Sequence, residues 1–234
     1  MPDAFVSWSG GKDSCLACHR AIASGIKVRH LLNMVTEDAQ WSRSHGLSAE
    51  LLRAQAEAIG IPLVQQRTTD SSYEIEFRNA LRAFKQEGIT SGVFGDIDFN
   101  EHRQWIERVC SAAGVTPHLP LWLEDQEKLL REFIDSGFES VIVATKADLL
   151  GEEWLGRKID AAFLADLKTK NITPCGEAGE YHSYVINGPL FRRRIEILET
   201  GRELKDSHWF LRITKYTLKP KRKAAKGKRC KKPS

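Results

Sequence analysis

The sequence predicts an α/β protein in which a doubly wound parallel sheet is joined to a smaller C-terminal α+β domain. Short apolar, β-prone segments alternate with helical segments over the first half of the chain. A glycine-containing loop directly follows the first apolar segment, and the last third changes to consecutive segments with β character. Alternation of this kind predicts βαβ units and a parallel sheet covered on both faces.

The first half contains four expected strands, each followed by an expected helix. The strands are expected at residues 3–8, 27–35, 61–64 and 91–95. The helices are expected at residues 15–24, 48–59, 71–87 and 100–113, and a glycine follows each of them. In the second helix Leu51, Leu52, Gln55 and Ile59 recur at helical spacing. Ligands of such sheets bind beyond the carboxyl ends of the strands, so the loops there are the first place to look for a site.

The second half begins after residues 117–122, which are interpreted as a boundary or crossover. Helices are expected at residues 124–136 and 159–170, and strands at 141–144, 181–186, 191–198 and 208–218. A Gly/Pro-containing loop at residues 173–179 precedes the last three strands. We therefore expect a nucleotide-binding domain at residues 1–125, a smaller substrate-binding domain at 126–218, and a basic disordered tail at 219–234.

Composition and charge exclude several classes of protein. Of the 234 residues 41% are hydrophobic and 28% charged, which is typical of a globular chain and excludes one that is mostly disordered. No apolar run is long enough to cross a bilayer, and no secretory signal is expected. Five cysteines are too few for a disulfide framework, which favours a cytoplasmic location.

The net charge of +4 comes from the C-terminus. The last twenty residues hold ten basic residues and no acidic ones, so residues 1–214 carry a net charge of −6. A mildly acidic body does not favour a nucleic-acid groove, and RNA is expected to be attracted weakly, if at all, through the tail.

The strongest chemical signal is the loop between the first strand and the first helix, which consists of Ser9, Gly10, Gly11, Lys12, Asp13 and Ser14. The glycines let the backbone approach an anion, and the N–H groups of residues 12–15 are expected to point at it from the helix N-terminus. Lys12 adds a positive charge. The loop has neither the Walker A spacing nor the dinucleotide fingerprint. A simple glycine turn with a capping serine is the alternative, but six residues of these types favour phosphate binding.

This loop resembles the pyrophosphate loop of the adenine nucleotide α-hydrolase superfamily. Members of that superfamily cleave ATP between its α and β phosphates, adenylate an oxygen of the substrate and release pyrophosphate before a nucleophile displaces AMP. The loop alone does not separate the branches of the superfamily.

Further segments resemble one branch, the diphthine–ammonia ligase family of ATP pyrophosphatases. The matching segments are residues 44–47 (SHGL), 55–63, 93–97 (VFGDI), 102–110, 120–122 (PLW) and 175–183 (CGEAGEYHS). The resemblance covers about residues 4–192, and the basic tail has no counterpart in it. Its implied activity is adenylation of the carboxylate of diphthine, a modified histidine of elongation factor 2. Ammonia then displaces AMP to give diphthamide, with ATP and Mg²⁺ as cofactors.

The resemblance also implies roles for individual residues. Ser9 to Ser14 are expected to hold the β and γ phosphates, with Lys12 stabilising the pyrophosphate and Asp13 orienting the loop or meeting Mg²⁺. Adenine is expected beside Asn33 and Met34, and the ribose or α-phosphate beside Gly95 and Asp96.

A second constellation comes from the loop near residue 180. Glu177, Glu180 and His182 are expected to bind or deprotonate ammonium or to orient the acceptor, although residue types alone favour a solvated acidic turn. His45, after the second strand, and Arg103, at the start of a helix, are further candidates for the nucleotide site. Cys15, Cys18 and the following histidine have the spacing of a metal site, but buried packing is the favoured interpretation.

Two alternatives stay open. The first is an AMP-forming pyrophosphatase that acts on another acceptor, either a small-molecule carboxylate or tRNA. The second is a sensor that binds an adenine nucleotide without turnover. A homodimer is also allowed, and no membrane partner is expected.

Overall fold

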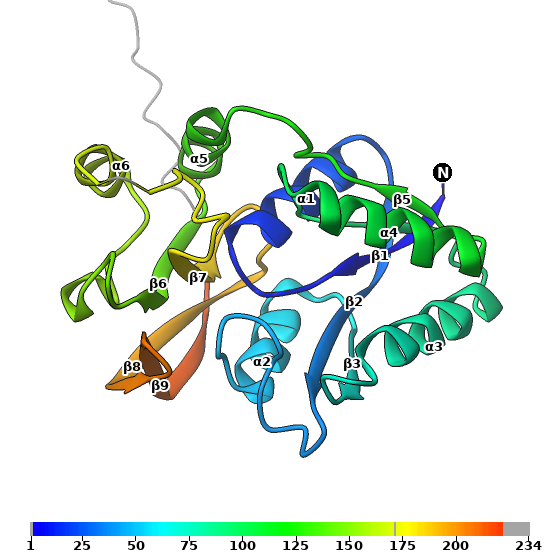
Figure 1. The fold of residues 1–234 in the computed structure, drawn as a ribbon, viewed down its shortest axis with the longest axis horizontal. Coiled ribbons are helices and arrows are strands. Elements are labelled where there is room, and N and C mark those ends of the chain that lie inside the picture. Colours follow the sequence, from blue (N-terminus) through cyan, green and yellow to red (C-terminus); the bar gives the residue numbers. More distant parts are fainter. Residues whose placement is uncertain (1, 171, 222–234) are drawn as a thin grey trace, which may run out of the picture.

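The computed structural model describes residues 2–170 and 172–221, and its first half forms a five-stranded parallel sheet (Figure 1). The strands are β1 (Asp3–Ser7), β2 (Lys27–Thr36), β3 (Leu63–Thr68), β4 (Ser91–Val93) and β5 (Thr116–His118), in the order β3-β2-β1-β4-β5. The connecting helices are α1 (Lys12–Ala23), α2 (Ala49–Ile59), α3 (Tyr73–Gln86) and α4 (Asn100–Ala113). The strand order reverses at β1, so β1 and β4 border the crevice where ligands of such sheets bind.

Alternate residues of β1 belong to two different cores. Ala4 and Val6 pack with α1 and α2, while Phe5 packs with α3 and α4. Side chains of a strand point to opposite faces in turn, so both faces of the sheet are covered by helices. The expectation of a doubly wound α/β sheet is confirmed.

The second half forms an antiparallel sheet in the order β7-β6-β9-β8. Its strands are β6 (Glu139–Lys146), β7 (Tyr181–Asn187), β8 (Arg193–Lys205) and β9 (His208–Pro220). Before and between them lie α5 (Gln126–Asp135), a 3₁₀ turn η1 (Glu152–Trp154) and α6 (Ala161–Leu167). This sheet lies across the molecule from α3, with α1 and α2 between (Figure 1).

Local sequence sets where several helices begin and end. The Ser48 hydroxyl accepts a hydrogen bond from the N–H of Leu51 at the start of α2, and Gly60 ends this helix at φ +82°. The Asp125 carboxylate caps α5 by accepting from the N–H of Lys128 at 2.8 Å. By contrast, α1 begins after Gly11, which has no side chain with which to cap it.

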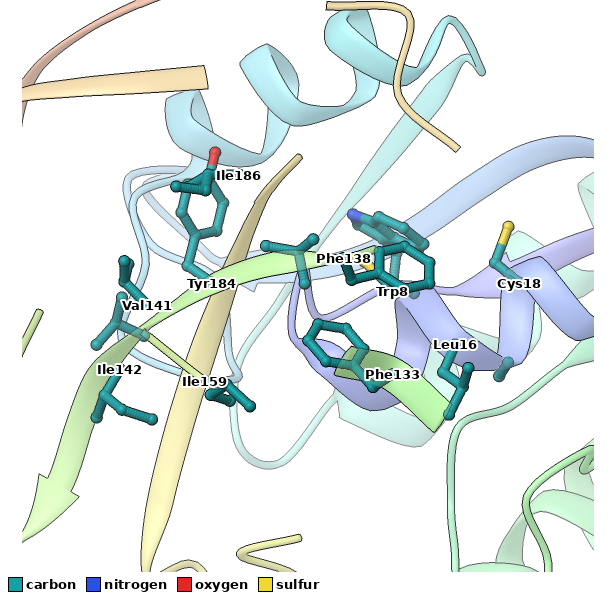
Figure 2. Packing of buried hydrophobic residues seen from close by; sticks show 14 of the residues in the cluster. Trp8, Leu16, Cys18, Phe133, Phe138, Val141, Ile142, Ile159, Tyr184 and Ile186 are labelled. Atoms are coloured by element: carbon teal, nitrogen blue, oxygen red, sulfur yellow. The ribbon is translucent and has the colours of Figure 1, made fainter. Parts of the chain in front are cut away.

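One hydrophobic core joins the two sheets. Trp8 and Leu16 face Phe133 and Phe138, whose rings stack 4.8 Å apart, in the packing that Figure 2 shows. Strand β7 also hydrogen-bonds to the first half, because the Val185 N–H donates to the Gly10 carbonyl at 3.0 Å. The second sheet is thus attached directly to the loop that precedes α1.

Three segments differ from the expectation. Residues 116–118 form the edge strand β5 where a boundary or crossover was expected, and β8 continues seven residues beyond the expected end at 198. Strand β9 runs to Pro220, so residues 219 and 220 lie in the sheet and not in a tail. Of the disordered tail expected at residues 219–234, residues 222–234 lie outside the described residues. None of the described helices is long and apolar enough to span a bilayer.

Candidate functional site

A cavity of about 680 Å³ opens at the carboxyl ends of β1, β2 and β4 and reaches the second sheet. This volume is in the range of small-molecule sites. Most of the residues expected from the sequence line it: Ser9, Lys12, Asp13, Ser14, Asn33, Met34, His45, Gly95, Asp96, Glu177 and His182. The first loop (residues 9–14) and the Gly/Pro-containing loop at residues 173–179, called the Gly-rich loop below, are far apart in sequence. Both therefore face the same cavity.

The glycines of the first loop permit close packing rather than lining the cavity. Gly10 has φ +79°, a conformation that side-chain-bearing residues rarely adopt. A Cβ atom on Gly11 would lie 2.4 Å from Cε1 of His45 and 3.2 Å from the Ser183 carbonyl oxygen. Both glycines are buried behind the site, where Gly11 lets His45 and β7 approach the loop and Gly10 makes room for side chains of α2.

The N-terminus of α1 presents two free N–H groups where four were expected to face an anion. The N–H of Lys12 donates to the Ser183 hydroxyl at 3.1 Å, and that of Cys15 to the Gly11 carbonyl at 3.2 Å. Within residues 2–170 and 172–221, those of Asp13 and Ser14 have no acceptor in any other residue. Ser183 of β7 supplies the cap that Gly11 cannot, and the two remaining groups can bind an anion.

Lys12 is buried, with 5% of its surface exposed, and is surrounded by electron-rich groups. Its Nζ lies 2.8 Å from Oδ2 of Asp13 and 5.1 Å from the centroid of the Tyr181 ring, and it also donates to the Cys175 carbonyl. Burial by itself lowers the lysine pKa, but the charge of Asp13 and the neighbouring Tyr181 and Cys175 raise it above the ordinary value. The ammonium group therefore stays protonated at neutral pH.

Two carboxyl groups at the cavity, those of Asp13 and Glu177, have raised pKa values. Burial raises the pKa of Asp13, and the charge of Lys12 opposes this shift. Burial and the negative charge of Asp13 raise the pKa of Glu177 to about 7. Asp96 accepts from His102 at 3.2 Å, a bond that raises the pKa of that histidine. The lining of the cavity thus places these carboxyl groups beside the cations Lys12 and Arg43.

His45 and His182 stack on one another at the wall of the cavity. Their ring centroids lie 4.5 Å apart, and Nδ1 of His45 is 3.2 Å from the Ser183 carbonyl oxygen. Burial lowers the pKa of His45 well below 6.5 and that of His182 to about 4, and the nearby Lys12 charge adds to both shifts. Both rings are neutral at pH 7, so each can accept a proton or a hydrogen bond.

Asn33 in β2 and Gly95 after β4 have structural partners at the cavity. The Asn33 amide donates to the Trp8 carbonyl and to the Ser42 hydroxyl, both at 2.9 Å, which holds the end of β2 against β1. A Cβ atom on Gly95 would lie 2.9 Å from the carbonyl carbon of Asp13 and from the N atom of Ser14. Gly95 therefore lies directly against the start of α1.

Besides Gly10 and Gly11, two more expected site residues lie outside the cavity lining. Glu180 is 4% exposed, and its Oε1 accepts from the N–H of Thr173 at 2.6 Å, so its carboxylate closes the Gly-rich loop. Arg103 pairs with Glu107 at 2.6 Å, whereas its neighbour His102 lines the cavity. Successive residues of a helix point about 100° apart, which separates these two side chains.

The structure adds residues to the site that the sequence did not indicate. Ser183 and Tyr181 enter it from β7, and an aromatic wall is formed by Tyr73 and Phe77 of α3, Phe94 directly after β4, and Trp105 of α4. Tyr73 is the first residue of α3 and Trp105 lies in the second turn of α4, and both helices begin beyond the strand ends, a position that was a usable signal. Among the described residues no three His, Cys, Asp or Glu side chains are grouped to hold a metal ion.

Comparison with known proteins identifies relatives over nearly the whole chain. The family model described as the diphthamide synthase N-terminal domain matches residues 3–117, and the model of the C-terminal domain matches residues 125–219. A Rattus norvegicus protein named diphthine–ammonia ligase is 30% identical, with 81% of this chain and 80% of that protein covered. The Danio rerio protein of the same name is also 30% identical, with 88% and 92% covered.

A Homo sapiens protein of that name is 29% identical, with 80% of this chain and 79% of that protein covered. A solved structure titled as a predicted tRNA methyltransferase subunit from Methanocaldococcus jannaschii aligns with a TM-score of 0.45 and 15% identity. The alignment covers 81% of this chain and 98% of the chain in that structure, but similarity at that level is too low to inform function. The two family models and the relatives confirm the resemblance seen in the sequence motifs: this chain belongs to the diphthamide synthase family.

Proposed function

We propose that this protein is an ATP-dependent amide ligase that converts diphthine on elongation factor 2 to diphthamide with ammonia, forming AMP and pyrophosphate. One observation carries the proposal: a single cavity joins an anion-binding helix start and Lys12 to Glu177 and His182. The relatives named diphthine–ammonia ligase supply the acceptor and the nucleophile. Because the acceptor is a translation factor, we place the reaction in the cytoplasm.

The first half of the reaction uses the first loop. A carboxylate oxygen of the acceptor attacks the α-phosphorus of ATP, and the bond between that phosphorus and the bridging oxygen breaks to release pyrophosphate. The free N–H groups of Asp13 and Ser14 bind phosphate oxygens, and Lys12 stabilises the charge that develops on the leaving group. Met34 lies where adenine is expected, at the end of β2.

Magnesium would neutralise phosphate charge when bound with ATP. Mg²⁺ in such sites uses only one or two carboxylates together with phosphate oxygens, so the lack of a three-residue cluster among the described residues agrees with its chemistry. Asp13 and Asp96 fit this requirement, since both line the cavity and each raises the pKa of Glu177.

The second half of the reaction uses the Gly-rich loop. The nitrogen of ammonia attacks the acyl carbon, the bond from that carbon to the AMP oxygen breaks, and the nitrogen loses a proton. Glu177 lines the cavity with a pKa of about 7, which suits a group that accepts this proton near neutral pH. His182 is neutral and lines the same cavity, so it can orient ammonia by accepting a hydrogen bond.

The test measures ATP turnover with Mg²⁺ and ammonium, with and without elongation factor 2 that carries diphthine. AMP is resolved from ADP, and the factor is weighed by mass spectrometry. The proposal requires AMP formation that depends on the factor and a mass change that matches replacement of a hydroxyl by an amino group. AMP without a change in the factor would instead indicate another carboxylate acceptor, and absence of AMP would leave only nucleotide binding.

The pH dependence of the reaction follows from Glu177. At a constant concentration of free ammonia, we expect kcat/KM to rise with pH through about 7 and then level off. The rise reports loss of the Glu177 proton, because only the deprotonated carboxylate can accept the proton that ammonia loses. Glu177→Gln should remove this rise and lower turnover by about 10²-fold or more.

Glu153→Gln is the matched control for that variant, since Glu153 is exposed and remote from the cavity lining. It should retain both the rise and the rate of the unchanged protein. A rise through the same pH in Glu177→Gln would show that another group accepts the proton.

A further inference from the structure

Gln126, the first residue of α5, hydrogen-bonds to two loops that face the cavity. Its side-chain Oε1 accepts from the N–H of Cys175 at 2.9 Å, and its Nε2 donates to Oδ2 of Asp98 at 2.7 Å. Its backbone carbonyl accepts from the Cys175 thiol at 3.3 Å. One residue outside the cavity lining is thus linked to the Gly-rich loop and to the loop after β4.

Cys175 connects Gln126 to Lys12. The N–H of Cys175 is bound by Gln126, and its carbonyl oxygen accepts from the Lys12 ammonium. The backbone of this residue is therefore held from both sides. Displacing it would move a hydrogen-bond acceptor away from the lysine that faces the phosphate site.

Glu177 follows Cys175 by two residues and depends on the same loop geometry. Its N–H donates to the Thr173 hydroxyl at 2.9 Å, and that of Gly176 to the Thr173 carbonyl at 3.0 Å, so the loop is folded as a unit. Asp98 lies close enough for its charge to contribute to the raised pKa of Glu177. A side chain that holds Asp98 beside this loop thereby affects both the position and the proton affinity of Glu177.

The bonds of Gln126 contribute little to overall stability. The Asp98 bond is exposed to water, and a typical hydrogen bond adds only about 1 kcal/mol net. Other elements already hold the second half of the chain, since Val185 and Tyr184 bind the first half through β7. The consequence of losing Gln126 is expected in the geometry of the site and not in folding.

We propose that Gln126 is a positioning residue that fixes the Gly-rich loop against Lys12 and couples it to the loop after β4. The expected effect of Gln126 on catalysis rests on the proposed ligase function. The expected effect of Gln126 on the Gly-rich loop does not rest on that function, because the position of Cys175 can be measured without turnover.

The first test is Gln126→Ala. Turnover should fall between about tenfold and a hundredfold, with a smaller change in KM for ATP, because misplaced groups affect the reacting geometry most. Cys175 is buried in the unchanged protein, so its alkylation by a maleimide should be slow and should become roughly tenfold faster in the variant. Cys15, Cys18 and Cys110 are buried elsewhere and serve as internal standards in the same mass spectrum.

The second test exchanges donor and acceptor between the two partners. Gln126→Glu keeps the acceptor for the Cys175 N–H but places a carboxylate against Asp98, so turnover should fall. Adding Asp98→Asn supplies an amide that donates to the new carboxylate and keeps the net charge unchanged. The double variant should recover most of the turnover and the slow alkylation of Cys175.

Lys128→Ala on the same helix is the control, since Lys128 is exposed and its side chain makes no hydrogen bond within the described residues. It should match the unchanged protein in all readouts. Unchanged alkylation of Cys175 in Gln126→Ala overturns the positioning role even if no AMP is formed by any variant. Faster alkylation with full turnover confines the role of Gln126 to the loop and overturns its link to catalysis.

Discussion

Replacing Lys12 by methionine is expected to lower AMP formation by about 10²- to 10³-fold, the usual effect of removing one group that stabilises transition-state charge in a buried site. The ammonium lies in a water-poor pocket between Asp13, Tyr181 and Cys175, so its charge acts at low dielectric. Methionine fills a similar volume without the charge. Turnover is measured as AMP released in the presence of the acceptor.

The fold should survive this change. Removing one partner of a buried ion pair destabilises the fold when the other partner stays charged and out of contact with water. The Asp13 side chain is 24% exposed at the cavity and can be hydrated. Lys12 opposes the rise in the pKa of Asp13, so that pKa should rise further in the variant. Lys27→Met, the same change at an exposed strand position, is the control and should keep full activity. Full turnover in Lys12→Met would remove Lys12 from the mechanism.

The sequence predicted the first sheet well because its elements carry strong local signals. Apolar strands and amphipathic helices alternate there, and helix ends such as Gly60 and Gly114 adopt the left-handed conformation that glycine favours. Strand β5 was missed because it has only three residues, one of them proline, and lies at the edge of the sheet. Its pairing with β4 is a tertiary contact with no local pattern.

The length of β8 was underestimated for a different reason. Beyond residue 197 this strand leaves the core and is exposed on both faces, whereas Leu211 of β9 stays buried. Cross-strand ion pairs hold this part, for example Glu203 with Arg212 and Glu199 with Lys215. Such a ribbon lacks the apolar alternation from which strands are predicted.

Most of the residues singled out by motifs line the cavity, but the motifs did not determine which way each side chain points. Glu180 and Glu177 belong to one short acidic segment, yet one closes the loop and the other faces the cavity. The cap that Ser183 gives to α1 joins residues 171 positions apart. Contacts of this kind form only when β7 packs against the first half of the chain, so no local sequence pattern predicts them.

Gly95→Ala is expected to lower turnover by about 10²-fold and to destabilise the protein by about 1–3 kcal/mol. The added methyl group would lie 2.9 Å from the backbone of Asp13 and Ser14, closer than real contacts allow. Backbone atoms cannot move aside as a flexible side chain can, so the start of α1 must shift. That shift would displace the free N–H groups of Asp13 and Ser14 from the phosphates.

Gly201→Ala separates this effect from the general consequences of replacing a glycine. Neither glycine has a positive φ, and a Cβ atom on Gly201 meets nothing nearer than the Arg212 Cβ at 4.0 Å. Gly201→Ala should therefore leave turnover unchanged and keep or slightly raise the unfolding midpoint, because alanine loses less conformational freedom on folding. If Gly95→Ala lowered stability but kept full turnover, the start of α1 would tolerate displacement, and phosphate binding would have to come mainly from side chains. Loss of turnover with nearly unchanged stability would instead show that the position of these two N–H groups limits the rate.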